Sequence, residues 1–322
     1  MSTVHRVITG HRAGPAALAA IFVFGGCASA LQSRSNGELT QHSGSGVNSA
    51  LFSFIIGLAI LSVIAVASGD IRTAISRIPA TVRDGTLAWW AVPAGVLGGV
   101  FIACASFAVA IVGVALFAIG AVVGQAATAL LVDRLGIGPN GRTSLTAARM
   151  ISALLAVVAV VVAASGSINA KGFSIAAVAA ALLGGTAATV QQGLNGRITV
   201  ASGHPLATTW LNFVFGSLGL LVGTAIAMLL LGDELSVPTA GPWWMWLGGV
   251  FGCIFILTSA WAVPRYGVLV FTLATIAGQL TAALVLDATV PVGDNEVAVS
   301  LVLGVILTFV AVAVGALRRR QS

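Results

Sequence analysis

The chain has 322 residues, of which 58% are hydrophobic and only 7% are charged. Soluble domains are about 25% charged, so this composition excludes a water-soluble enzyme and indicates an exterior that faces lipid. A net charge of +6 would favour a nucleic-acid partner in a soluble protein, but in a membrane protein basic residues mainly report orientation. We therefore expect that a lipid bilayer surrounds the protein and that it has no nucleic-acid partner.

Ten apolar runs follow one another along the chain, and each has the length of about 20 residues that a transmembrane helix needs. Breaking residues lie between them, and Pro264 with Gly267 predicts a tight turn between the eighth and ninth runs. The pattern predicts an all-α integral membrane protein with ten transmembrane helices. The runs lie at 14–35, 47–69, 87–108, 109–132, 145–166, 172–194, 205–231, 242–263, 266–287 and 297–317.

The basic residues gather on one side of the predicted membrane. If the amino terminus is cytoplasmic, 13 of the 15 basic residues are cytoplasmic, and only Arg34 and Lys171 lie outside. Because cytoplasmic loops are enriched in Lys and Arg, this distribution predicts that both termini are cytoplasmic, the N-in/C-in arrangement. The 13 are Arg6, Arg12, Arg72, Arg77, Arg83, Arg134, Arg142, Arg149, Arg197, Arg265, Arg318, Arg319 and Arg320.

The chain contains an internal repeat. An offset of 159 residues places Gln32 on Gln191, and an offset of 154 residues places Gln125 on Gln279. Amides are scarce in these runs, so shared hydrophobicity alone would not align them. The sequence therefore predicts two copies of one five-helix unit.

The two units occupy residues 1–167 and 168–322. Because each unit has an odd number of helices, the second enters the membrane from the side opposite to the first. Two such inverted five-helix repeats create a pseudo-twofold axis in the membrane plane and place a solute site near the middle of the bilayer.

Two pairs of amides are the first candidates for that site. Gln32 and Asn36 are four residues apart, as are Gln191 and Asn195, so each pair lies on one face of a helix. An amide both donates and accepts hydrogen bonds, so such a pair can bind a neutral or zwitterionic solute without a fixed charge. Alternatively, the amides bridge neighbouring helices.

Further polar residues lie in other runs. Gln125 and Gln279 each follow a glycine, and Asn212 lies deep in the seventh run, so all three are candidates to line the site. Glu38 is the candidate for proton coupling, because it follows the Gln32 and Asn36 face. Arg34 lies four residues before Glu38, so an ordinary ion pair between them is the alternative.

The sequence predicts neither a metal site nor a cofactor. Cys27, Cys104 and Cys253 lie in apolar runs without metal-binding spacing, so they are expected to be inert. No HExxH, GxSxG or acidic metal cluster supports catalysis. We therefore expect that the protein is not an enzyme.

Tryptophans lie near the ends of several runs. Trp89 and Trp243, near the start of the third and eighth runs, are typical of the aromatic belt at a membrane interface. Trp210 and Trp261 are predicted either to pack in the core or to line a cavity.

The second repeat carries a specific string of glycine, amide and aromatic residues, and the first repeat carries a weaker copy that includes Gln32 and Asn36. The string resembles the YdcZ-like branch of the drug/metabolite transporter (DMT) superfamily. The resemblance implies a bacterial inner-membrane protein made of two fused five-helix halves, in a superfamily of small-solute exporters and exchangers, and it implies no substrate. The string reads Gly184-Gly185, Gln191-Gln192-Gly193-Leu194-Asn195-Gly196, Pro205-Leu206-Ala207 and Asn212-Phe213-Val214-Phe215-Gly216.

These observations lead to one functional hypothesis and one alternative. We expect a multi-pass secondary transporter, an exporter or exchanger, that moves a small organic solute by alternating access. The alternative is a subunit of a lipid-carrier flippase or a membrane scaffold without transport activity. Substrate, direction, proton coupling and a homodimeric state are left open.

Overall fold

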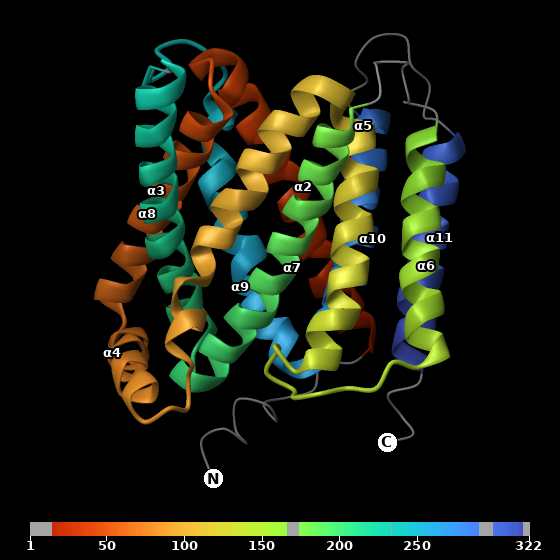
Figure 1. Ribbon diagram of the computed structural model, residues 1–322, viewed down its shortest axis with the longest axis horizontal. Helices are drawn as coiled ribbons and strands as arrows, with labels where there is room; N and C mark the ends of the chain where they lie inside the picture. The colour runs from red at the N-terminus through yellow and green to blue at the C-terminus, as the bar shows by residue number, and fades with distance from the viewer. Residues whose placement is uncertain (1–14, 166–173, 233, 290–298, 318–322) are drawn as a thin grey trace.

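The computed structural model describes residues 15–165, 174–232, 234–289 and 299–317, and every regular element among them is a helix. Figure 1 shows the long helices standing side by side. In chain order the elements are α2 (Pro15–Ser43), α3 (Gly46–Ala67), α4 (Gly69–Arg83), η1 (Trp89–Ala94), α5 (Gly95–Leu135), α6 (Ala147–Ala164), α7 (Ile175–Ser202), α8 (Pro205–Leu231), η3 (Trp243–Leu247), α9 (Gly248–Tyr266), α10 (Val268–Thr289) and α11 (Val299–Leu317).

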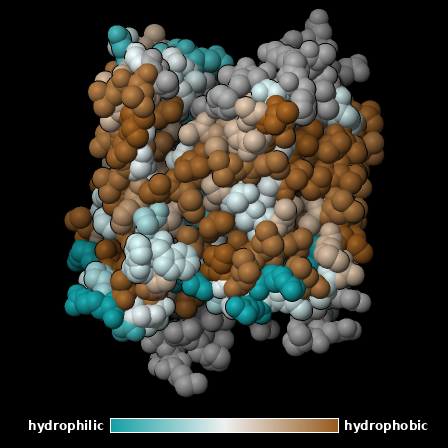
Figure 2. All heavy atoms as spheres, in the orientation of Figure 1, coloured by the Kyte–Doolittle hydropathy of each residue, from teal (hydrophilic) through white to brown (hydrophobic). Residues whose placement is uncertain are grey.

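The described helices have the composition of membrane helices. Five segments are long and apolar enough to span a bilayer, and four shorter apolar helices accompany them. Figure 2 shows hydrophobic side chains across the middle of the visible face and hydrophilic ones toward its two ends. The structure agrees with the predicted all-α membrane class, while the number of spans and the N-in/C-in orientation stay predictions. The five are Gly46–Ala67, Phe117–Leu135, Ile175–Ser202, Pro205–Leu230 and Trp243–Tyr266.

The long helix α5 contains most of the third predicted run and the whole of the fourth, and it doubles back on itself. Cys104 lies against Gly184, while Ala121 lies against the neighbouring Gly185. In a straight helix, the 17 residues from Cys104 to Ala121 would span about 25 Å, so both could not reach the same part of α7. Figure 1 shows the first arm of α5 rising in gold and the second returning in yellow. The two predicted runs are therefore two arms of one helical segment.

The turn between α9 and α10 agrees with its prediction. Gly267 caps α9 with a φ of +82°, a conformation that costs glycine nothing but strains other residues. Pro264 lies inside the last turn of α9. The break predicted from these two residues therefore lies at Gly267.

The amphipathic helix α4 was not predicted, because its residues are too polar for a transmembrane run. Ile71, Ala74 and Ile78 recur every three or four residues and are buried against the protein. Arg72 and Arg77 lie on the exposed part of the helix. A segment that we expected to be a connection is thus a helix packed beside α7 and α8.

Equivalent positions of the two repeats make equivalent contacts. A Cβ atom added at Gly57 would lie 2.2 Å from the Phe213 ring, and one added at Gly216 would lie 2.3 Å from the Phe54 ring. The centroids of these two rings are 4.9 Å apart. Both contacts obey the offset of 159 residues. The predicted boundary between residues 167 and 168 falls outside the described residues, and the division into domains stays a prediction.

Backbones also approach closely at equivalent glycines. A Cβ atom at Gly26 would lie 2.4 Å from the carbonyl oxygen of Thr275, and one at Gly185 would lie 2.0 Å from that of Ala121. Small residues at such crossings let membrane helices pack by van der Waals contact. α2 is thereby held against α10, and α7 against the second arm of α5.

This packing predicts that Gly26→Ala destabilises the protein by about 1–3 kcal/mol, because backbone atoms rather than a flexible side chain would have to move. Gly37→Ala on the same helix is the control, since nothing lies within 4 Å of the added methyl group, and it should gain up to about 1 kcal/mol of helix propensity. Thermal unfolding of the purified variants in detergent measures both effects. Equal melting temperatures would contradict the close crossing.

Candidate functional site

A cavity lies at the centre of the molecule, between helices from both repeats. Its volume is about 90 Å³. α2, α5, α7 and α10 contribute amide side chains to its lining, and α3, α8 and α9 contribute aromatic or aliphatic groups. Five of the seven predicted lining residues meet there, and they are Gln32, Asn36, Gln125, Gln191 and Gln279.

The other two predicted residues lie behind the lining rather than in it. The side-chain nitrogen of Gln191 donates to the Oδ1 atom of Asn212 at 3.3 Å, and the nitrogen of Asn212 donates to the Oδ1 atom of Asn195 at 3.0 Å. Asn195 and Asn212 are almost fully buried. They therefore fix the orientation of Gln191. The sequence predicts that both line the cavity, but in the structure they are not among the lining residues.

The first repeat has a shorter version of this chain. Ser53 takes the position equivalent to Asn212, and its hydroxyl donates to the Oδ1 atom of Asn36. Gln32 is more exposed than its counterpart Gln191. The second repeat thus holds its amides with more hydrogen bonds than the first.

Two glycines make room for the amides of the opposite repeat. A Cβ atom at Gly98 in α5 would lie 2.8 Å from the side-chain nitrogen of Gln191, and one at Gly252 in α9 would lie 2.5 Å from that of Gln32. The offset of 154 residues relates the two glycines. Sequence reasoning missed them, although applying this offset to the third and eighth runs would have paired them.

The remaining pair of amides comes from the second arm of α5 and from α10. The side-chain nitrogen of Gln279 donates to the hydroxyl of Ser29 at 2.9 Å. The backbone oxygen of Gln125 accepts a bond from the hydroxyl of Thr189 at 3.4 Å. Gln125 and Gln279 therefore line the cavity from two helices that are hydrogen-bonded to their neighbours, α5 to α7 and α10 to α2.

Sequence reasoning also passed over Gln192, which lines the cavity beside Gln191. The hydroxyl of Thr272 donates to its Oε1 atom at 3.1 Å. Thr275 lines the cavity as well, and its buried hydroxyl has no hydrogen-bond partner among the residues that the structure describes. The repeat could not indicate Gln192, because its equivalent in the first half is Ser33.

The candidate for proton coupling lies away from the cavity. Glu38 is not among the lining residues, and its carboxylate lies 3.9 Å from the imidazole of His42, one turn later on α2. Arg34 instead lies 6.0 Å from the ring centroid of Trp244. The alternative ion pair between Arg34 and Glu38 is therefore wrong, and a coupling role for Glu38 stays a prediction.

A buried carboxylate at the end of α5 connects three helices. Asp133 forms an ion pair with Arg149 of α6, and its two oxygens accept the backbone N–H groups of Val268 and Leu269 at 3.4 Å each. These N–H groups lie at the start of α10, where a helix has unsatisfied donors. Asp133 therefore joins α5, α6 and α10 at one end of the molecule.

The aromatic residues divide between surface and interior. Trp89 and Trp243 are 74% and 75% exposed, as expected of belt residues. Trp261 packs in the interior beside Arg265. Trp210 lines a groove at the surface and not the central cavity.

Comparison with known proteins adds three findings. The family model described as "Putative inner membrane exporter, YdcZ" matches residues 17–162 and 176–314. One solved crystal structure of a protein, at 18% sequence identity, has a TM-score of 0.68, and the match covers 95% of this chain and 98% of that one. At this identity the likeness shows the fold alone. No curated protein matches the chain.

Proposed function

The chain belongs to the YdcZ family of the DMT superfamily, a family of multi-pass inner-membrane proteins, and from this membership we propose that it moves a small organic solute by alternating access. The family match covers both halves of the chain, which supports a transporter rather than an enzyme.

The cavity lined by amides from both repeats is the observation that carries the proposal. No residue that lines it in the described part of the chain is charged. Burying a charged solute without a counter-charge costs far more than burying a neutral one that finds hydrogen bonds. The proposed solute therefore carries no net charge, and it has both donors and acceptors for the amides and an apolar part for the phenyl rings.

The related packing of the two halves supports alternating access. We propose that residues 1–167 and 168–322 form inverted repeats of five spans each, with both termini in the cytoplasm. Phe54 and Phe213, which contact each other beside the cavity, lie near the axis that relates the halves. Rocking about this axis would open the cavity first to one side of the membrane and then to the other.

Counterflow in proteoliposomes tests the proposal. A panel of radiolabelled amines, nucleobases and amino acids should contain a solute whose uptake depends on the same solute inside the vesicle. For that solute, Gln32→Ala and Gln191→Ala should each lower the counterflow rate about tenfold or more, since they remove hydrogen bonds that the site provides. Gln41→Ala is the control, because Gln41 lies exposed on α2 outside the cavity.

Two results would contradict the proposal. One is the absence of counterflow for every solute of the panel in vesicles that contain folded protein. The other is an equal loss of rate in the Gln41→Ala control.

A further inference from the structure

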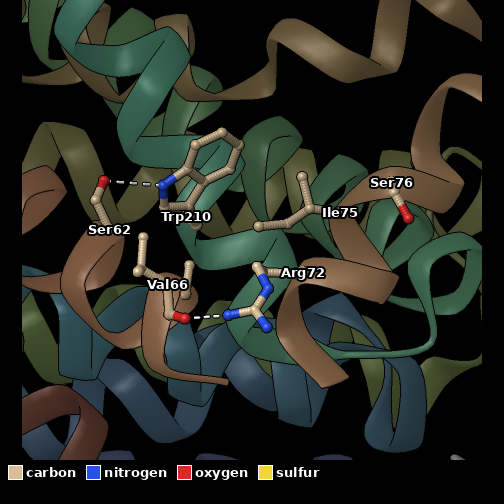
Figure 3. Close-up of a pocket in the computed structure, with 7 residues that line it drawn as sticks. Ser62, Val66, Arg72, Ile75, Ser76 and Trp210 are labelled. Carbon is tan, nitrogen blue, oxygen red and sulfur yellow. Dashed lines mark hydrogen bonds between the residues drawn. The ribbon is translucent and has the colours of Figure 1, made fainter. Parts of the chain in front are cut away.

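A groove opens on the surface of the protein between the end of α3, the amphipathic helix α4 and the first part of α8. Its volume is about 280 Å³. Figure 3 shows the side chains around it, which come from all three helices. They include Ser62 and Val66 of α3, Arg72, Ile75 and Ser76 of α4, and Trp210 of α8.

The walls of this groove are mainly apolar. The indole N–H of Trp210 donates to the hydroxyl of Ser62 at 3.0 Å, as the dashed line in Figure 3 marks. The only polar atom of the indole is therefore satisfied inside the protein, and the ring forms a fixed wall. Ile75 and Val66 complete a surface that suits a hydrocarbon chain.

A positive charge lies at the edge of the groove. The guanidinium of Arg72 donates to the carbonyl oxygen of Val66, and a guanidinium carries five donors. Arg77 and Arg83 also lie exposed on α4, so its three arginines outnumber the two exposed carboxylates, Asp70 at the start of the helix and Asp84 at its C-cap. The combination of an apolar groove and an excess of positive charge is complementary to a lipid with an anionic headgroup.

The groove lies where a bilayer lipid can enter it. Val63 and Val66 beside it are 70% and 71% exposed, which is expected of residues that face acyl chains. Ser68 and the start of α4 follow directly after the apolar helix α3, so Arg72 lies near the level at which headgroups begin. In the proposed orientation this is the cytoplasmic side, whose leaflet is rich in anionic lipids.

We propose that this groove binds one anionic phospholipid of the surrounding bilayer. Its acyl chain lies against Trp210 and Ile75, and its phosphate lies at Arg72. The site is separate from the central cavity, so this proposal stands or falls independently of the transported solute.

Tryptophan quenching by brominated lipids tests the proposal. The full-length protein is reconstituted in phosphatidylcholine vesicles that contain a small fraction of brominated phosphatidylglycerol or, for comparison, brominated phosphatidylcholine. The share of quenching that is due to Trp210 is the difference between the wild type and Trp210→Phe. Brominated phosphatidylglycerol should be preferred about fivefold at this site, which corresponds to about 1 kcal/mol for one basic residue near the membrane surface.

Substitutions of two arginines on α4 distinguish a specific lipid-binding site from nonspecific electrostatic attraction to the membrane. Arg72→Gln should abolish the preference, whereas Arg83→Gln, which removes an equal charge outside the groove, should keep it. Native mass spectrometry, which needs no tryptophan variant, should show phosphatidylglycerol retained by the wild type and lost from Arg72→Gln. Equal preference for both lipids, equal loss in both arginine variants, or no quenching of Trp210 would overturn the proposal.

Discussion

Asp133→Ala is expected to destabilise the protein by about 3 kcal/mol, the lower end of the effect of removing one partner from a buried ion pair, because Asp133 is buried and Arg149 is partly exposed. The variant would leave the guanidinium of Arg149 without its partner and would remove the acceptor of the backbone N–H groups of Val268 and Leu269. Thermal unfolding in detergent, monitored by tryptophan fluorescence, measures the loss of stability as a lower melting temperature.

A double-mutant cycle shows whether the pair itself is responsible. Combining Asp133→Leu with Arg149→Met removes both charges together, and such apolar replacement of a buried pair is often neutral or even stabilising. We therefore expect the double variant to be more stable than the single variant Asp133→Leu, which leaves Arg149 without its partner. A double variant that loses as much as the two single variants added together would show that the residues act independently.

Gly98→Ala is expected to lower counterflow about tenfold or more while the fold is retained. The added methyl group would lie 2.8 Å from the side-chain nitrogen of Gln191, and the flexible end of Gln191 would move away from Asn212 instead of forcing the backbone apart. One methyl group in a tight site commonly changes discrimination by about 10- to 200-fold. The transport assay with the solute found in the panel measures this loss.

The neighbouring Gly99 provides the matched control. A Cβ atom there would lie 3.4 Å from the side chain of Leu220, an ordinary contact away from the cavity. Gly99→Ala should therefore transport at nearly the wild-type rate, and both variants should unfold near the wild-type temperature. Equal rates for the two variants would remove the support for Gln191 as a residue of the site.

Much of the central site could be predicted from the internal repeat. Gln32, Gln125, Gln191 and Gln279 were found because polar residues aligned between halves that are otherwise apolar, and all four line the cavity. Gln192 was not found, because its counterpart is a serine and one residue next to another on a helix points about 100° away. The residues of α7 from Gln191 to Gly196 are all buried, so this part of the helix is enclosed on more than one face, and Gln192 lines the cavity beside Gln191.

The fold was predictable where the thickness of the bilayer limits the length of a helix. A straight helix of the 41 residues of α5 would be about 60 Å long, twice the roughly 30 Å hydrocarbon thickness, so two runs were expected in place of one. α4 was not predicted, because hydropathy identifies spans and not helices that lie along a surface. Its amphipathic pattern of Ile71, Ala74 and Ile78 was the available signal.

The unequal hydrogen bonding of the two repeats has an energetic consequence. Asn36 accepts from a single hydroxyl, whereas Asn195 accepts from an amide that also holds Gln191. If the apolar packing were the only term, the two conformations that the proposed pseudo-twofold axis would exchange would have similar free energies. Because the polar side chains break that equivalence, we expect the empty protein to rest mainly on one side of its cycle, with the opposite conformation as the minor population.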